Sequence, residues 1–425
     1  MNWEQKWESL ARRWLPAAYL AIFLSGMASF AEAVDVPALY KEHCVACHGE
    51  NRLGGIGPAL LPENLERLRK PEAAKVIRES RPATQMPAFG DKLQAEEIQA
   101  LTDWIYTKVV PAPVWGEAEI KASQVVDTAA IELPNKPSKA LKGADPMNLF
   151  IVVETGDHHV SVLDGDKLER LHRFPSRYAL HGGPKYSPDG RFVYFASRDG
   201  WITKYDLWNL TVVAETRAGL NTRNAAVSGD GKWVMVANYL PHTLVVLDAK
   251  DLSLTKIIPV ANAKGDKTSR VSAVYDATPR KSFVAALKDV PEVWEISYDP
   301  KAEPVAEGLV HDFQYKEGDF KPGFLYPRRT LLKDYLDDFF FTQSYDEILG
   351  ASRTATKGQV IYLDGRKKIA DLDLPGMPHL GSGITWKWTD PAGKERLVMA
   401  SPNLNEGLIT VIDLKTFENV KQIRI

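Results

Sequence analysis

Two kinds of hydrophobic pattern divide this chain. Between residues 34 and 107, apolar residues recur at helical spacing, most clearly over 95–106, and a second amphipathic helix is expected over Val36–Cys44. From Asn148 onward, short runs of β-branched and aromatic residues alternate with turn-forming residues, which is typical of strands. The pattern therefore predicts a small all-α domain followed by a large all-β domain.

The strand-rich part contains a repeat. Several strands end in an aspartate and then a turn, at Val160–Asp164, Ile202–Asp206, Leu244–Asp248, Val360–Asp364 and Ile409–Asp413, with a looser copy at 293–299. The first three aspartates follow one another at intervals of 42 residues, and we interpret them as turn formers. Four short strands in a unit of that length indicate a β-propeller, and we count six units.

The N-terminus carries a targeting signal. Basic residues precede an apolar run from Leu15 to about Phe30, and Ala31-Glu32-Ala33 has the small-x-small form of a cleavage site. The run is shorter than the ~20 residues that a spanning helix needs. We therefore predict a signal peptide over 1–33 and a periplasmic protein, with an uncleaved anchor as the alternative.

A proline-rich segment separates the two predicted domains. Prolines recur from Pro111 to Pro146 without apolar periodicity, which predicts an extended linker over 108–146 rather than a packed element. The expected boundaries are thus 34–107 for the helical domain and 147–425 for the propeller. A net charge of −2 argues against a nucleic-acid partner.

The two cysteines of the chain both lie in Cys44-Val45-Ala46-Cys47-His48. C-x-x-C-H is the attachment motif of a c-type haem, in which the thiols bond to the porphyrin and the histidine binds iron. A thioredoxin-like pair needs no such histidine, and a zinc site would need a second ligand pair, which does not follow. We predict one covalent haem c, with His48 as an axial iron ligand and electron transfer as its role.

The sixth iron ligand is expected between the two predicted helices. The layout of this domain resembles a small class I cytochrome c, and Met86, in a proline-flanked loop, lies where that family carries its methionine ligand. The alternative is that Met86 only fills space in the core. Ligation by histidine and methionine raises the reduction potential of a haem, which suits an electron relay.

A haem c domain joined to a propeller resembles the cytochrome cd1 family. The stretches that carry the resemblance are Arg177–His181, Ser197–Gly200 and Asp206–Trp208. The resemblance implies an eight-bladed propeller that binds haem d1, with His181 as the axial ligand of its iron. About six blades are present here, so the resemblance also implies that C-terminal blades are missing from this chain.

Three further stretches resemble one branch of that family, at Ser269–Tyr275, Pro291–Tyr298 and Tyr335–Phe341. The branch oxidises dihydro-haem d1 to haem d1, turning a propionate side chain into an acrylate, as the last step of haem d1 biosynthesis in denitrification. The resemblance implies an oxidoreductase whose electrons pass to haem c and then to a soluble periplasmic acceptor. It also implies that a cytochrome cd1 nitrite reductase receives the product.

The resemblance assigns roles to further residues of the propeller. His379 matches one of two distal histidines of the nitrite reductases and would take a proton from the substrate side chain, whereas the region compared with the other histidine, 324–329, has none. Arg198, Arg223 and Arg270 are candidate clamps for substrate carboxylates.

Two other functions stay open at this point. One is a haem d1 carrier or chaperone without dehydrogenase activity, and the other is a cytochrome cd1-type nitrite reductase, which the missing distal histidine disfavours. The remaining histidines lack motif support, and we expect them to be structural or exposed; they are His43, His158, His159, His172, His242 and His311.

Overall fold

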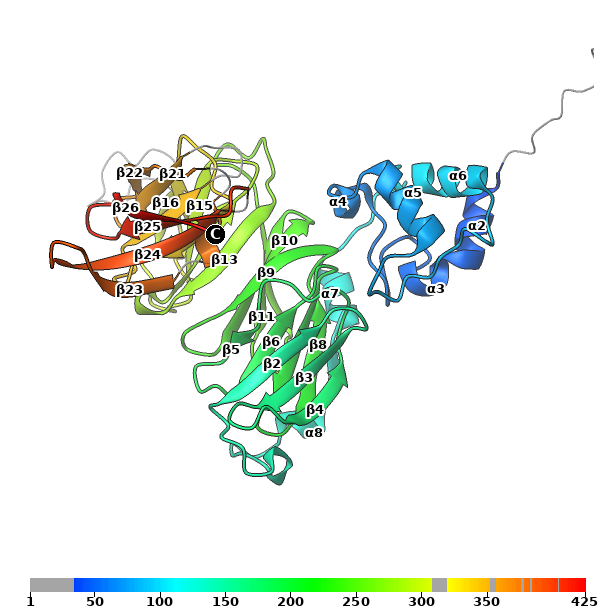
Figure 1. Ribbon diagram of the computed structural model, residues 1–425, viewed down its shortest axis with the longest axis horizontal. Helices are drawn as coiled ribbons and strands as arrows, with labels where there is room; N and C mark the ends of the chain where they lie inside the picture. The colour runs from blue at the N-terminus through cyan, green and yellow to red at the C-terminus, as the bar shows by residue number, and fades with distance from the viewer. Residues whose placement is uncertain (1–33, 308–318, 352–356, 376–377, 383, 404) are drawn as a thin grey trace, which may run out of the picture.

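The computed structural model describes residues 34–307, 319–351, 357–375, 378–382, 384–403 and 405–425. A helical domain stands at one side of the molecule and sheets make up the rest (Figure 1). The predicted signal peptide over 1–33 and His311 lie outside the described residues. Within the described ranges, no helix is both long and apolar enough to cross a membrane.

The helical domain agrees with the predicted all-α domain. Its helices are α2 (Val36–His43), α3 (Val45–His48), α4 (Pro62–Leu65), α5 (Lys70–Glu79) and α6 (Ala95–Ile105). Asp35 caps α2 through the backbone N–H of Ala38, and a capping box opens α6. Tyr40, Ile98 and Leu101 are almost fully buried where α2 packs against α6.

The prediction of an extended linker is wrong for the middle of 108–146. That segment forms α7 (Glu117–Ser123), β1 (Val125–Val126), α8 (Thr128–Ile131) and the 3₁₀ turn η1 (Lys139–Leu141). β1 pairs with a propeller strand, and Ile120 and Leu141 are buried in two propeller cores. Ile120 and Leu141 are too far apart in the sequence to show a helical or strand period, but each packs against the propeller and holds the segment there.

The propeller consists of antiparallel sheets that follow one another along the chain, and the described residues form six of them. Their strands are β2 (Leu149–Glu154), β3 (His159–Asp164) and β4 (Arg170–Pro175); β5 (Lys185–Tyr186), β6 (Phe192–Ala196), β7 (Trp201–Asp206) and β8 (Thr211–Arg217); β9 (Asn221–Val227), β10 (Trp233–Leu240), β11 (Thr243–Asp248) and β12 (Leu254–Pro259); β13 (Val271–Ala277), β14 (Ser282–Leu287), β15 (Glu292–Ser297) and β18 (Pro327–Leu331); β19 (Asp338–Phe341), β20 (Glu347–Ala351), β21 (Gly358–Tyr362) and β22 (Lys367–Leu372); and β23 (Ile384–Thr389), β24 (Glu395–Asn403), β25 (Leu408–Asp413) and β26 (Asn419–Arg424). Between β15 and β18, a side hairpin is formed by β16 (Val305–Glu307) and β17 (Asp319–Lys321), and two further 3₁₀ turns are η2 (Thr278–Arg280) and η3 (Leu380–Ser382).

The blades are held together by apolar layers between neighbouring sheets. Phe283 and Trp294 of one blade meet Met235 and Val246 of the blade before it, all essentially without solvent exposure. Because both faces of such a blade are covered, β14 is buried at every position. Its sequence is therefore a continuous apolar run, without the alternation of polar and apolar residues that a half-exposed strand shows. Each fully buried aliphatic or aromatic side chain contributes about 1.5–3 kcal/mol.

The helical domain contacts the propeller at several points. The Leu53 carbonyl accepts from Arg217 Nη2 at 2.5 Å, and the Leu220 carbonyl accepts from Asn64 Nδ2 at 3.0 Å. Leu61, 1% exposed, packs in the same apolar cluster as Leu220. These contacts place α4 beside the propeller end where β9 begins.

The aspartates at the strand ends form turns, as predicted, and one of them also carries a buried ion pair. Asp206 accepts from the backbone N–H groups of Trp208 and Asn209, and Asp248 accepts from that of Lys250. Asp206 has no side-chain exposure and also pairs with the buried Arg191, whose Nη2 lies 2.7 Å from Oδ2.

We expect Asp206→Ala to lower the free energy of unfolding by about 3–5 kcal/mol, because it leaves the Arg191 guanidinium buried without its counter-charge. Asp248→Ala, at the same place in the next repeat, is the matched control and should cost about 1 kcal/mol, the value of its turn hydrogen bond. Urea unfolding followed by circular dichroism checks both values. Equal losses for the two variants would contradict the assignment of the larger effect to the ion pair.

Candidate functional site

The predicted haem-binding motif lies at the junction of α2 and α3. Cys44 and Cys47 are both unpaired thiols and partly exposed, and one turn of helix separates them. Burial, with the neighbouring Cys47, raises the pKa of Cys44 to about 11. The hydroxyl of Tyr40 donates to the Gly49 carbonyl at 2.8 Å and ties α2 to the end of this motif.

His48 is 6% exposed and fixed in one orientation. Its Nδ1 lies 2.8 Å from the Pro58 carbonyl oxygen, so this nitrogen carries the hydrogen and Nε2 keeps its lone pair. Burial lowers the pKa of His48, which keeps the ring neutral and able to bind a metal. A Cβ on Gly57 would lie 3.0 Å from the ring, so glycine leaves the space that the ring occupies.

Met86 lies in the loop between α5 and α6. The Ser80 hydroxyl donates to its carbonyl at 2.7 Å, and its side chain borders the same apolar cluster as Cys44. Two accessible thiols, a neutral oriented histidine and a thioether beside one cluster are residues that fit a covalent haem c.

The predicted residues of the propeller gather at one end of it. β5, β9, β13 and β19 are the edge strands that contact one another from blade to blade, and β23 holds the same place in the last described blade. Three of the predicted residues stand just before inner strands: His181 before β5, Arg270 before β13 and His379 before β23. Arg223 lies near the start of the inner strand β9. Arg198 follows β6, and because β6 is antiparallel to β5, its end lies at the same end of the propeller as the start of β5. The structure therefore brings these five residues to one face.

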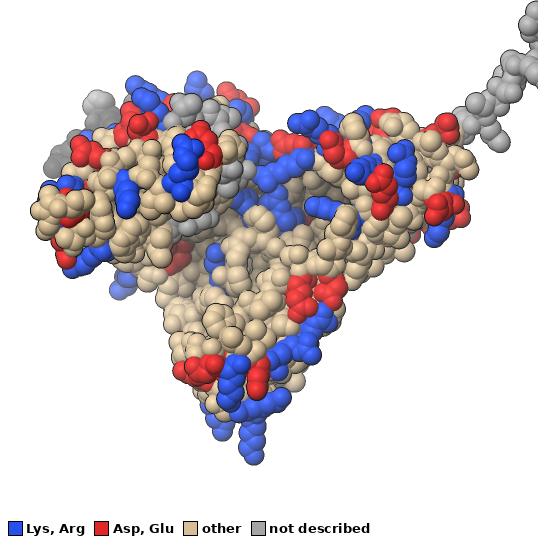
Figure 2. All heavy atoms as spheres, viewed as in Figure 1, with Lys and Arg blue, Asp and Glu red and all other residues tan. Residues whose placement is uncertain are grey.

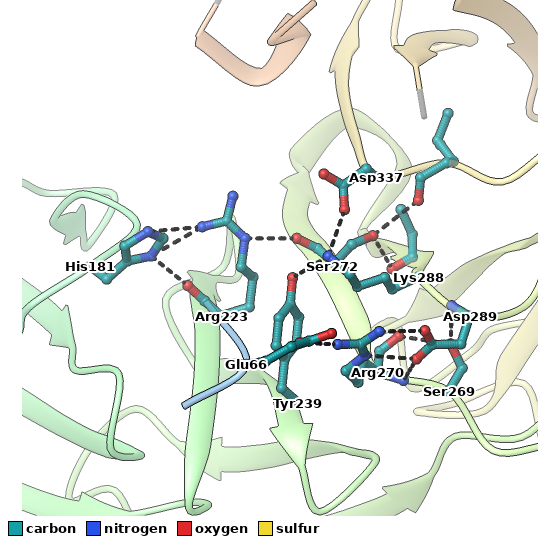
Figure 3. Close-up of polar contacts among 12 residues, drawn as sticks. Glu66, His181, Arg223, Tyr239, Ser269, Arg270, Ser272, Lys288, Asp289 and Asp337 are labelled. Carbon is teal, nitrogen blue, oxygen red and sulfur yellow. Dashed lines mark hydrogen bonds and ion pairs between the residues drawn. The ribbon is translucent and has the colours of Figure 1, made fainter. Parts of the chain in front are cut away.

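His181 contacts Arg223 closely (Figure 3). Its Nδ1 lies 2.9 Å from the Arg223 carbonyl, and the Nη1 of Arg223 lies 3.0 Å from Nε2. Burial, and then the charges of Arg223, Arg198 and Arg67, lower the pKa of His181 to about 4. The ring is thus neutral, as an iron ligand must be, and Arg223 has to move for Nε2 to bind iron.

Arg270 is held by two carboxylates. It makes a bidentate pair with Asp289, at 2.7 and 2.9 Å, and its Nη1 lies 2.6 Å from Glu66 of the helical domain (Figure 3). The hydrogen bonds to Asp289 raise the pKa of Arg270 further, so it stays charged. Its contacts link the two domains, which a clamp for substrate alone would not do.

Sequence reasoning missed two residues of this face. Tyr239, 6% exposed, has the cationic groups of Lys288, Arg270 and Arg198 within 5.2–5.6 Å of its ring. Lys288 lies 3.4 Å from Asp337. Neither residue stands in a motif, and only the return of each strand to the same end brings them here. Figure 2 shows Lys and Arg gathered between the helical domain and the later blades.

His379 precedes β23 and lies beside Asp338 of the preceding blade, with Nδ1 3.3 Å from Oδ2. The segment 324–329, which was compared with the second distal histidine, contains no histidine and runs into β18, the strand at the far edge of its blade from β13.

Comparison with known families matches both parts of the chain. The family described as "Cytochrome D1 heme domain" matches residues 144–425, and "Cytochrome C oxidase, cbb3-type, subunit III" matches residues 31–105. The chain therefore consists of a cytochrome c domain followed by a β-propeller of the haem d1 type.

Several relatives share long stretches with this chain. Dihydro-heme d1 dehydrogenase of Pseudomonas aeruginosa is 52% identical over 404 residues, which cover 95% of this chain and 76% of that protein. Nitrite reductase of Stutzerimonas stutzeri is 25% identical over 61% of this chain and 48% of its own length. Protein NirF of Pseudomonas aeruginosa is 36% identical over 35% of this chain and 38% of its own length.

One solved structure is similar over most of the fold. It is described as dihydro-heme d1 dehydrogenase NirN in complex with DHE. The TM-score is 0.79 at 54% identity, with 91% of this chain and 77% of that chain covered.

We expect the pKa of His181 to be about 4 in the free protein, as ¹⁵N NMR of its imidazole would measure. Arg223→Met removes a positive charge and should raise the pKa of His181, though not to the ordinary value, because burial is the larger cause. Arg280→Met, which removes an arginine paired with Glu295 instead, is the control and should leave the titration unchanged.

The lowered pKa of His181 also makes the stability of the folded protein depend on pH. Between about pH 4 and pH 6.5 the unfolded chain binds a proton at His181 that the folded protein does not, so stability rises with pH over this window. Titration of His181 near pH 6.5 in the unaltered protein would contradict both expectations.

Proposed function

Since this chain belongs to the cytochrome D1 heme domain family, we propose that it is an oxidoreductase that converts dihydro-haem d1 to haem d1. The observation that carries the proposal is the 52% identity over 95% of the chain to a dihydro-heme d1 dehydrogenase. The reaction would be the last step of haem d1 biosynthesis and would turn a propionate side chain of the substrate into an acrylate.

Oxidation of the propionate side chain to an acrylate requires specific groups from the protein. Making the double bond removes two electrons and two protons from the substrate side chain. The site therefore needs a base for a proton, a way for electrons to leave, and positive charge for the carboxylates of the substrate. When bound, haem c supplies a one-electron acceptor, and Cys44, Cys47, His48 and Met86 would hold it.

Different residues of the propeller would bind the iron, bind the carboxylates and accept the proton. His181 would bind the iron of the substrate through Nε2 once Arg223 moves aside, and Arg223 would then be placed to meet a carboxylate. Arg198 would bind a second carboxylate as a planar bidentate donor. His379 would act as the base, because a neutral imidazole accepts a proton in the physiological range.

Arg270 would lie at the edge of the site, where it links the two domains. Its pair with Asp289 keeps the guanidinium in place, and its contact with Glu66 lies on the cytochrome c side. Because these two carboxylates already offset its charge, Arg270 would serve mainly to hold the cytochrome c domain at the site.

We place the reaction in the periplasm, where the predicted signal peptide and the haem motif direct the protein. A soluble periplasmic acceptor would take the electrons, and a cytochrome cd1 nitrite reductase would receive haem d1. The relation to a nitrite reductase and to protein NirF supports this context.

The deciding experiment mixes the purified protein with dihydro-haem d1 without oxygen and follows the visible spectrum. We expect the mature haem d1 chromophore to form while the haem c bands become reduced. A variant with both Cys44→Ser and Cys47→Ser should bind the substrate but lose conversion, by a factor of about 10² or more, because its electrons have no acceptor.

The alternatives give other outcomes in the same assay. A carrier would bind dihydro-haem d1 and haem d1 alike, convert neither, and be insensitive to the cysteine substitutions. A nitrite reductase would consume nitrite with an artificial electron donor after loading with haem d1. Either result would overturn the proposed dehydrogenase.

A further inference from the structure

Asp338 and His379 form a contact between two neighbouring blades. The Nδ1 of His379 lies 3.3 Å from Oδ2 of Asp338, and the side chains are 23% and 8% exposed. Within the described part of the chain, this buried oxygen has no hydrogen bond of good geometry. Because a buried acceptor without a hydrogen bond costs free energy, a small movement of the imidazole toward Oδ2 is favoured.

The carboxylate of Asp338 is held from several sides. The hydroxyl of Tyr275 donates to Oδ1 at 2.8 Å, and the backbone N–H of Phe339 donates to the same oxygen at 3.0 Å. A Cβ on Gly381 would lie 2.4 Å from both oxygens, so only glycine lets the turn after His379 approach this closely. The group is therefore fixed before any substrate binds.

Other charged groups face the same pair. Lys185 of β5 is close enough for the charge of Asp338 to act on its pKa, and Asp337 lies next in the chain and pairs with Lys288. Burial, with the charge of Asp338 as the next cause, raises the pKa of Tyr275. Tyr275 therefore remains a hydroxyl donor to the carboxylate at every physiological pH.

We infer that Asp338 is a positioning residue that holds His379 in the tautomer with hydrogen on Nδ1, so that Nε2 takes the proton from the substrate. The inference rests on the proposed function, in which His379 is the base. Asp338 acts through His379, and Tyr275 acts one contact further away by fixing the carboxylate. No motif in the sequence connects these three residues, which come from three blades.

The step balances with the acceptors already named. One C–H bond of the propionate side chain breaks, its proton goes to Nε2, and the imidazolium that forms lies beside the Asp338 carboxylate. The second C–H bond would then break and its proton would go to solvent water, while the two electrons would pass one at a time to haem c and the soluble acceptor. Fixing a histidine by a buried carboxylate is known to favour such proton transfer in serine hydrolases.

The first test is ¹⁵N NMR of His379 in the free protein, which needs no substrate. In the unaltered protein we expect the Nδ1–H tautomer. In Asp338→Asn we expect the other tautomer to gain population, because the carboxylate that accepts from Nδ1 is gone. An unchanged tautomer in Asp338→Asn would overturn the inference.

The second test measures turnover of dihydro-haem d1 and its binding separately. Asp338→Asn should lower kcat by about 10²–10⁴, with substrate affinity unchanged in a spectral titration. Tyr275→Phe should give a smaller loss of the same kind. A fall in affinity with kcat unchanged would instead make Asp338 a substrate-binding or structural group and overturn its positioning role.

Asp276→Asn is the matched control. Asp276 accepts from the hydroxyl of Tyr298 at 2.9 Å, so it repeats the tyrosine–aspartate contact without a histidine. It should cost stability but leave the tautomer of His379 and kcat unchanged. If the unaltered protein does not convert dihydro-haem d1, the proposed function fails, while the NMR comparison still decides the role of Asp338.

Discussion

Blade-to-blade packing is the constraint on which the rest of this structure depends. Neighbouring blades bury apolar layers against each other, and the blades that begin with β5, β9, β13, β19 and β23 repeat the same antiparallel path from an inner strand outward. The inner strands consequently begin at one end of the propeller. This shared direction, rather than closeness in sequence, brings His181, Arg223, Arg270 and His379 to one face. The same layers restrain the strand ends, so the side chains on them are held in place.

The site concentrates positive charge, and the fold offsets part of it with carboxylates. Arg270 pairs with Asp289 and Lys288 lies beside Asp337, whereas Arg223 donates to the Ser272 carbonyl and to His181, which are neutral. The positive charge of a cation paired with a carboxylate is already neutralised. The charge of a guanidinium with only neutral partners is not, so an anionic ligand beside it is stabilised. The arrangement therefore suits a macrocycle that carries several carboxylates.

The two domains are joined by more than a covalent linker. The segment between them packs onto propeller strands through Ile120 and Leu141, and Glu66 reaches across to Arg270. A chain anchored at several points has little freedom to move as a body. Electron transfer between two redox centres depends steeply on their separation, so an anchored cytochrome c domain suits a protein that passes electrons from substrate to haem c.

The sequence by itself determined the features that depend on neighbours along the chain. The haem motif at Cys44–His48, the repeat of strand and aspartate, and the helix predicted over 95–106 all follow from local spacing. The structure has the helix at Ala95–Ile105 and the repeated strands, and the cytochrome c family match covers the motif. Only the tertiary structure decided which distant groups meet. The packed linker, the contact of Arg270 with Glu66 and the contact between Asp338 and His379 join residues from different blades or domains. No local pattern encodes such contacts, because their geometry arises from how whole sheets stack.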